Sequence, residues 1–287
     1  MKQLLTIILI GFSTSLFSQE KVSFLTPPPS PEASFTQQLV NGEITVHYSR
    51  PLARGRKIFG SLVPYDSLWR TGASGATILH ITEEIIIGDK PLKEGKYAMF
   101  TIPGVNEWTI IINADTSLHG AFGYTSSKDV HRFKVSSAKS EQFTEAFTIS
   151  FTDLSNRGSG FLTLAWENTV VKIPVRSPVD DKVMAEINTR LIVNKEQNKE
   201  LFYQAANYYY TTGRDLKLAA SWAAEAEKMD SEKFNYPNLL QKILADQKDY
   251  EAAVGAAERA LALAKKNKMN NAVTSLKRRI AELKTKL

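Results

Sequence analysis

Cationic side chains crowd a short stretch of the sequence that also holds aromatic residues. The cations between residues 50 and 70 are opposed by a single acid, Asp66, and they are Arg50, Arg54, Arg56, Lys57 and Arg70. A guanidinium group presents a planar fork of donors that fits a carboxylate or a phosphate. An aromatic ring can stack on a sugar or on the guanidinium itself. The stretch therefore predicts recognition of an anion or a carbohydrate.

We hypothesise that six residues of this region line a pocket for an anionic or carbohydrate-like ligand: Tyr48, Arg50, Arg56, Lys57, Trp69 and Arg70. The alternative is that Arg50 and Arg70 donate to loop carbonyls or pair with acids such as Asp66 or Glu167. In that case they hold a connection of about 25 residues against its domain. Apolar residues within the connection, Phe59 and Val63 among them, indicate that it is packed.

The residue pattern gives other chemistries less support. The sequence has no cysteine, no Gly-x-Ser-x-Gly elbow and no phosphate-binding glycine loop. The four histidines are His47, His80, His119 and His131, and no two of them have the spacing of metal ligands on a helix. The alternative is that three of the four converge in the folded domain and bind a metal. We predict no cofactor and no metal ligand, and the catalytic residues of any enzyme remain unassigned.

Residues 1–18 have the layout of a secretory signal peptide. Lys2 precedes an apolar run from Leu4 to Phe12, and small residues follow up to Ser18. Cleavage there predicts a periplasmic or secreted protein of net charge +5, one less than the +6 of the whole chain. The apolar run is too short to span a bilayer, and no transmembrane segment is expected after cleavage. Nucleic acid is not an expected partner of an exported chain.

A proline-rich linker over residues 19–32 leads into a domain that we expect over residues 33–178. Runs rich in β-branched and aromatic residues are separated by turn dipeptides such as Asn41-Gly42. These runs cover residues 34–40, 43–48, 77–87, 96–102, 108–113, 132–136, 145–151, 161–166 and 170–175. No connection between them has a helical period, so we predict an all-β antiparallel sandwich or jelly roll.

Residues 179–287 predict an all-α domain with an internal repeat of 34 residues. Alanines at corresponding places are Ala219 and Ala253, Ala223 and Ala257, and Ala226 and Ala260. The two segments resemble tetratricopeptide repeats, although Pro237 and Gln241 replace the aromatic and the small residue usual there. Capping helices are expected near residues 181–194 and 270–287. The alternative is an ordinary helical bundle.

Two further features of this domain allow two interpretations each. The aromatic residues Tyr208 to Tyr210 and Trp222 form either a core or the wall of a peptide groove. The segment 265–287 holds eight basic residues and one acid, Glu282, and forms either a solvated helix face or a surface for an acidic partner.

Several exact strings in the β domain carry a resemblance to a known family. Early strings are Tyr48-Ser-Arg-Pro51, Gly55-Arg-Lys-Ile-Phe-Gly60, Val63-Pro-Tyr65 and Trp69-Arg-Thr-Gly-Ala73, and later ones begin at Gly95, Glu107 and Leu162. The region from about Pro31 to Val175 resembles the secreted bacterial proteins grouped as domain of unknown function 2911. Ser74 departs from that pattern, which usually has asparagine after Gly72-Ala73. The resemblance implies a secreted β domain whose activity is uncharacterised.

We therefore interpret the chain as an exported binding or interaction module with an arginine and aromatic cluster. One alternative is an extracytoplasmic enzyme, such as a hydrolase, that uses the same cluster. Another is an envelope scaffold that docks a protein partner through its helical repeats.

Overall fold

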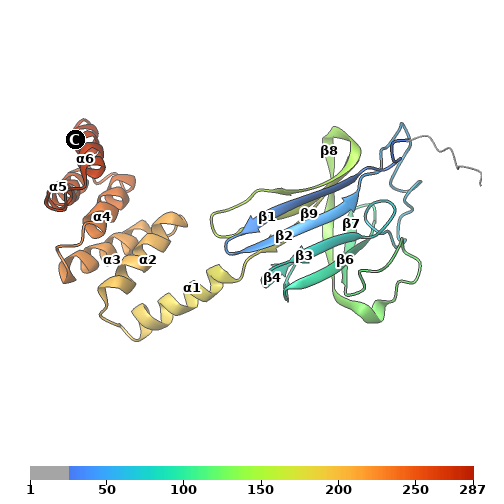
Figure 1. Cartoon of the computed structure of the whole chain (residues 1–287), viewed down its shortest axis with the longest axis horizontal. Helices are drawn as coiled ribbons and strands as arrows, with labels where there is room; N and C mark the ends of the chain where they lie inside the picture. The colour runs from blue at the N-terminus through green and yellow to red at the C-terminus, as the bar shows by residue number, and fades with distance from the viewer. Residues whose placement is uncertain (1–25) are drawn as a thin grey trace, which may run out of the picture.

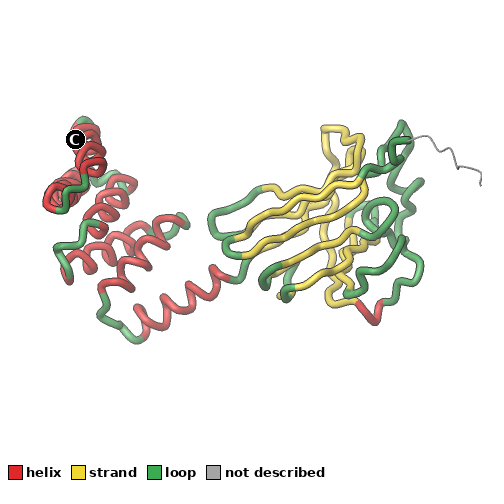
Figure 2. The backbone as a smooth tube through the Cα atoms, viewed as in Figure 1, coloured by secondary structure: helices red, strands yellow, loops and turns green. Residues whose placement is uncertain are grey.

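The computed structural model describes residues 26–287, so the predicted signal peptide and the first part of the predicted linker lie outside the described residues. Strands fill the first part of the described chain and helices the second (Figure 1, Figure 2). The strands are β1 (Glu32–Leu39), β2 (Gly42–Ser49), β3 (Thr77–Ile81), β4 (Ile85–Ile87), β5 (Lys90–Leu92), β6 (Gly95–Ile102), β7 (Glu107–Asn113), β8 (Asp129–Thr152) and β9 (Ser159–Arg176).

These strands form one antiparallel sheet in the order β1-β2-β3-β6-β7-β8-β9-β4-β5. The first part of β8 pairs with β7, and from Ser137 onward it pairs with β9. Register shifts between Lys139 and Thr148 interrupt this second ladder, and such irregularities bend a strand. The two halves of the sheet enclose a common core, where the ring of Tyr48 on β2 lies 5.9 Å from that of Phe147 on β8. The predicted antiparallel β domain is confirmed.

Alternation along the strands sets which side chains enter this core. Ile44, Val46 and Tyr48 of β2 are buried, as are Leu162, Leu164 and Trp166 of β9. Successive side chains of a strand point to opposite faces, so a period of two residues fills one face. Full burial of each such side chain contributes about 1.5–3 kcal/mol.

Strand boundaries differ from the predicted runs in three places. The predicted run 77–87 is wrong in its middle, because the chain bends at Thr82 to Glu84 and β4 joins the other half of the sheet. The predicted pairs of runs at 132–151 and at 161–175 are continuous strands, β8 and β9. The short strand β5, which contains Pro91, was not expected; it lies at the sheet edge, where a residue without an N–H is tolerated.

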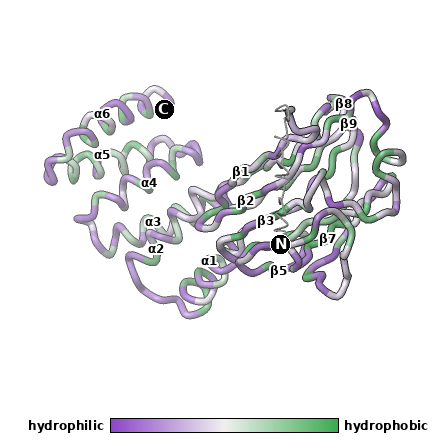
Figure 3. The backbone as a smooth tube through the Cα atoms, turned by 45° about the vertical axis from the view of Figure 1, so that its right-hand side comes forward, coloured by the Kyte–Doolittle hydropathy of each residue, from purple (hydrophilic) through white to green (hydrophobic). Residues whose placement is uncertain are grey.

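Six α-helices follow within the described residues, and they confirm an all-α second domain. They are α1 (Val179–Ile187), α2 (Lys199–Thr211), α3 (Leu216–Met229), α4 (Asn235–Asp246), α5 (Tyr250–Lys266) and α6 (Asn270–Lys284). A π-helical turn (Asn188–Val193) extends α1, and together they cover the predicted first capping helix. Hydrophobic and hydrophilic residues alternate at short intervals along α2 to α6 (Figure 3), which is typical of packed amphipathic helices.

The 34-residue period is visible in the helix starts. The helices α3 and α5 begin at Leu216 and Tyr250, and each is preceded by an aspartate whose side chain accepts hydrogen bonds from the first turn. These N-caps are Asp215 and Asp249, and such a cap stabilises a helix by about 1 kcal/mol. The repeated alanines are fully buried in the helix contacts.

The two domains are joined by a short connection. Only Ser177 and Pro178 separate β9 from α1, and α1 leads from the β domain to the remaining helices (Figure 1). Among residues 26–287, no helix combines the length and the apolar character needed to cross a bilayer.

Candidate functional site

The connection between β2 and β3 carries most of the predicted site residues and is pinned to the sheet. Leu52 bridges to Ala146, and Trp69 bridges to Thr101 through backbone hydrogen bonds of 2.7 and 2.8 Å. Phe59 and Val63 are buried in the β-domain core. The interpretation that this connection is packed is therefore confirmed.

Two of the predicted site residues, Tyr48 and Trp69, belong to that core. The Tyr48 hydroxyl accepts from the Ile149 amide at 3.0 Å. The Trp69 ring is 8% exposed and stacks on Trp166 at 5.9 Å between ring centroids, while its Nε1 donates to the Gly72 carbonyl at 3.0 Å. Both rings have neighbouring aromatic side chains against them, so they act first as structural residues.

Three predicted cations lie outside any common pocket. Arg50 donates from Nε to the Phe147 carbonyl at 3.1 Å and from Nη2 to Thr148 Oγ1 at 2.8 Å, which ties the connection to β8. Arg56 is exposed and donates to the carbonyls of Ala53 and Leu52 at 3.0 and 2.7 Å. Lys57 is exposed too. The alternative reading of Arg50, a residue that holds the loop through carbonyls, matches its contacts.

Arg70 is placed differently, at a groove of about 290 Å³ that we call the Arg70 groove. Its apolar walls are Leu62, Val63, Pro64, Leu68, Trp69 and Trp166. The Arg70 Nε is enclosed and has no hydrogen-bond partner among the described residues. Burying such a donor without an acceptor costs about 1–3 kcal/mol. Arg70 thus lines an apolar groove, and its guanidinium has unused hydrogen-bonding capacity.

The backbone beside Arg70 is strained. Thr71 has φ of 58° and Ser74 also has φ of 58°, in the left-handed region that a β-branched residue rarely adopts. Gly72 has φ of 154°, and a Cβ there would lie 3.0 Å from the Ser49 carbonyl oxygen, so only glycine fits. Strained residues of this kind cluster at functional sites, where the surrounding structure holds them. Ser74 stands where the resemblance leads one to expect asparagine, and asparagine adopts this φ more readily.

The positive charge of the region is not neutralised by direct ion pairs. Within residues 26–287, none of the five cations between residues 50 and 70 lies in an ion pair with a carboxylate. The nearby acids face backbone amides instead. Glu145 accepts from the Arg54 N–H at 2.8 Å, and Glu167 accepts from the Ile58 N–H at 3.0 Å.

Metal coordination has no geometric basis in the described part of the chain. No group of three or more histidine, aspartate or glutamate side chains there lies close enough to hold an ion.

The sheet, its pinned connection and the Arg70 groove together define an antiparallel β module with an open, partly apolar groove. Residues 30–175 match the family described as Protein of unknown function (DUF2911), and the chain belongs to this family. The match covers the β module and ends before the helices. A comparison with curated proteins finds no match for the chain.

Sequence reasoning placed Trp69 and Arg70 in the site but did not assign the apolar walls to it. Val63 was one of the apolar residues that indicated a packed connection, and Trp166 falls in the family string that begins at Leu162. Their convergence on Arg70 depends on the pairing of Trp69 with β6 and on the position of β9, and neither contact leaves a local signal.

Proposed function

We propose that the β module is a binding domain for a ligand that joins an anionic group to an apolar body, and that the Arg70 groove is its site. The observation that carries this proposal is the enclosed, unpartnered Nε of Arg70, a residue that lines an otherwise uncharged and largely apolar groove. A carboxylate or phosphate oxygen would accept from the guanidinium, and charged hydrogen bonds of this kind are strong. The apolar walls would take the rest of the ligand.

The charge of Arg70 supports the same assignment. Gly120 packs closely against its guanidinium, since a Cβ built there would be only 3.4 Å from Nη1. Arg70 has no carboxylate partner among the described residues, so its charge is available to a ligand. The predicted preference for an anion therefore rests on Arg70. Stacking on a sugar has less support, because Tyr48 and Trp69 pack in the core.

Binding is favoured over catalysis by the lining of the groove. Among its described lining residues, Arg70 is the one charged side chain, and none is a carboxylate or an imidazole. General acid or base catalysis needs such a group within hydrogen-bond reach of the reacting atoms. If the protein were an enzyme that uses this groove, the ligand or a movement of the protein would have to supply the general acid or base.

We propose further that α2 to α5 constitute two tetratricopeptide units and that the protein is exported. The 34-residue spacing of the helix starts, their aspartate caps and the buried alanines support the first proposal. The layout of residues 1–18 supports the second. Amino-terminal sequencing of the protein recovered outside the cytoplasm should give Gln19 or Glu20 as the first residue.

Isothermal titration calorimetry of the full chain tests binding at the Arg70 groove. The probes separate the contribution of the anionic group from that of the apolar body. Octanoate and octyl phosphate carry both an apolar body and an anionic group. Octanol lacks the charge, inorganic phosphate lacks the apolar body, and glucose 6-phosphate replaces the apolar body with a sugar. Octanoate or octyl phosphate should bind in a saturable manner, and octanol and phosphate should bind about tenfold or more weakly, since a charged hydrogen bond contributes about 1.5–3 kcal/mol.

Variants locate the binding. Arg70→Ala should reduce the affinity about tenfold or more, whereas Arg70→Lys, which keeps the charge, should lose less. Lys57→Ala is the matched control, because it removes an exposed cation of the same connection that does not line the groove. Circular dichroism should give the same fold for all three. The proposal fails if neither amphiphilic anion binds, or if Arg70→Ala binds as well as Lys57→Ala.

A further inference from the structure

The two edges of the sheet, as formed by the described residues, differ in character. One edge is β5, which is three residues long and contains Lys90 and Pro91. Shortness, a lysine and a proline are features that keep a sheet edge from pairing with another chain. The other edge is β1, which is eight residues long, contains neither lysine nor proline and keeps an unbroken register with β2 (Figure 1). The β1 edge therefore lacks the protection that β5 has.

The outer side of β1 presents unpaired backbone groups. The Arg50 N–H donates to the Pro31 carbonyl at 2.8 Å, so these residues form a hydrogen-bonded pair just before β1. Bonded and non-bonded pairs alternate along an antiparallel ladder, and the next bonded pair is Ala33 with Tyr48. The even-numbered residues of β1 therefore direct their N–H and C=O groups away from β2. Within residues 26–287 their N–H groups have no partner, and these residues are Glu32, Ser34, Thr36 and Gln38.

The core behind β1 is incompletely covered. The rings of Phe35 on β1 and Phe151 on β8 pack edge to face, with 6.1 Å between their centroids. Both rings pack against the β-domain core, but both are only partly buried. A further strand beside β1 would cover apolar surface here, which is favourable. The edge thus combines unpaired backbone groups with exposed apolar surface.

The sequence of β1 is complementary to a second copy of itself. With a two-fold axis at Phe35, an antiparallel pair places Glu32 opposite the second copy's Gln38. It likewise places Ser34 opposite the second copy's Thr36, so every outward N–H group enters a hydrogen-bonded pair. Phe35 meets its own copy in a non-bonded pair, where side chains approach most closely. Glu32 is the one charged residue of β1, and it faces a neutral residue.

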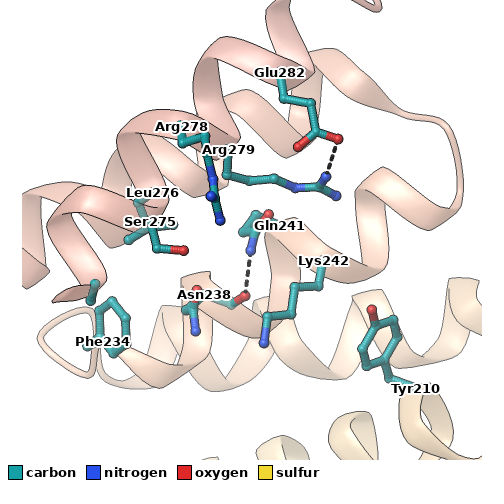
Figure 4. Close-up of a pocket in the computed structure, with 11 residues that line it drawn as sticks. Tyr210, Phe234, Asn238, Gln241, Lys242, Ser275, Leu276, Arg278, Arg279 and Glu282 are labelled. Atoms are coloured by element: carbon teal, nitrogen blue, oxygen red, sulfur yellow. Dashed lines mark hydrogen bonds and ion pairs between the residues drawn. The ribbon is translucent and has the colours of Figure 1, made fainter.

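The charged surface of the α domain is less suited to self-association. Figure 4 shows a groove lined by Lys242 of α4 and by Arg278 and Arg279 of α6, with Glu282 as its one acid. Two copies that met through this groove would bring like charges together, which is unfavourable. In the β1 pair, the two Glu32 side chains lie at opposite ends.

We infer that two copies of the chain associate through β1, so that their sheets join into one antiparallel sheet across a two-fold axis at Phe35. The pairing occupies the free edge of both copies, and the opposite edge, β5, is protected. A two-fold contact of this kind closes after two copies, so the expected assembly is a dimer and not a fibre. Dimerisation through β1 needs no ligand in the Arg70 groove.

Sedimentation velocity of the chain from Gln19 onward, without the predicted signal peptide, tests the inference. Over concentrations up to about 100 µM, it should show a monomer–dimer equilibrium and no larger species. A monomer at every concentration overturns the inference, including the case in which β1 pairs with a different protein.

Two double variants of equal charge assign the dimer to β1. Ser34→Lys with Thr36→Lys places lysines of the two copies directly opposite each other, which destabilises a strand pair. Both side chains are exposed, so the fold should persist while the Kd of the dimer rises about tenfold or more. Thr116→Lys with Ser126→Lys adds the same charge at exposed positions of the connection between β7 and β8, and should change the Kd less than about twofold. Equal losses would make net charge the cause and would overturn the inference.

A charge-reversed partner separates lost pairing from lost folding. Ser34→Glu with Thr36→Glu should also be monomeric by itself. Mixed with the lysine variant, it should form a heterodimer, because opposite charges then face each other across the axis. A mixture that stays monomeric would show that these positions do not face each other, contrary to the inferred pairing.

An engineered cysteine reports the register, because the chain has none of its own. Phe35→Cys brings two thiols together on the axis, within the Cα separation that a disulfide spans, and mild oxidation should link the copies. Ala33→Cys is the matched control, since its thiols would lie about 14 Å apart along the strands and should stay reduced. Cross-linking of both variants alike, or of neither, overturns the inferred register.

Discussion

Arg157 donates from its Nε to the carbonyl of Thr212 at 3.0 Å, and this bond joins the β domain to the helices. Arg157 lies in the turn between β8 and β9, while Thr212 is the C-cap of α2. The adjacent Asn156 side chain donates to the Thr211 carbonyl. The last carbonyls of a helix lack intrahelical partners and attract positive charge. The turn therefore supplies the capping donors of α2 from another domain.

Arg157→Ala should loosen the orientation of the two domains without unfolding either. The lost contact contributes about 1 kcal/mol, as expected for a hydrogen bond near a helix C-terminus. Small-angle scattering, or distances between spin labels on β6 and α5, should report a broader distribution. Lys172→Ala, which removes an exposed ion pair on β9, should leave the distribution unchanged. An unchanged distribution in Arg157→Ala would show that the short connection and the remaining contacts, such as that of Asn156 with Thr211, suffice to fix the domains.

Asp180 should make the α domain sensitive to acid. Burial opposes its ionisation, but hydrogen bonds from Arg214 and Tyr208 outweigh burial and hold the pKa of Asp180 below its usual value. A depressed pKa contributes stability above the pKa of the unfolded chain, and this contribution is lost as the pH falls through the folded pKa. Urea unfolding followed at 222 nm should therefore give falling stability below about pH 4.

Asp180→Asn provides the comparison for that pH dependence. It cannot ionise, so it should be less stable than the wild type at pH 7 and should lose less stability between pH 5 and pH 3. The Tyr208 hydroxyl stays protonated throughout, because burial and its bond to Asp180 raise the pKa of Tyr208 to about 12. If both proteins lose stability with the same slope, other carboxylates control the acid response.

Tyr48→Phe should destabilise the β domain by about 1–3 kcal/mol, the cost of leaving a buried donor unpaired. The donor is the Ile149 N–H, which the Tyr48 hydroxyl accepts across the core. Urea unfolding followed by tryptophan fluorescence measures the change. Tyr97→Phe is the control, since its hydroxyl donates to the exposed Lys93 carbonyl, and it should cost less than about 0.5 kcal/mol. If Tyr48→Phe and Tyr97→Phe lose the same stability, the hydrogen bond of Tyr48 does not stabilise the contact between the two halves of the sheet.

Trp69→Ala should cost about 3–5 kcal/mol, as large aromatic truncations in a core do. Its ring lies among Phe59, Trp108, Phe147 and Trp166. Phe122→Ala should have almost no effect, because that ring is 93% exposed. Thermal unfolding of both variants makes the comparison. A small loss of stability in Trp69→Ala would show that the Trp69 ring is not part of the structural core.

The fold could be predicted from the sequence where residue types recur at a regular spacing. The buried face of Ile44, Val46 and Tyr48 follows from alternation, and the buried alanines follow from the repeat. The division between β3 and β4 was not predictable in this way, because the chain changes partners there while its composition stays strand-like. The strand β5 is too short to leave a pattern and depends on its pairing with β4.

The site shows the same limit at the level of single residues. Trp69 and Arg70 are neighbours in the sequence, and both were placed in one pocket. In the extended backbone that pairs with β6, the Trp69 ring enters the core while the enclosed Nε of Arg70 stays without a partner at the groove. Composition identified the residue types, but the direction of each side chain depends on contacts with distant strands.

Only Ser177 and Pro178 connect β9 to α1. The direction in which the other helices project from the β domain therefore depends on the number of residues in α1. Each residue of an α-helix advances the chain by about 100° around the axis and 1.5 Å along it. Adding or deleting one residue in α1 would turn α2 to α6 by more than a quarter of a revolution and separate Thr212 from Arg157. A family member could thus point its helical surface in a new direction through a single codon, with every residue of the β module unchanged.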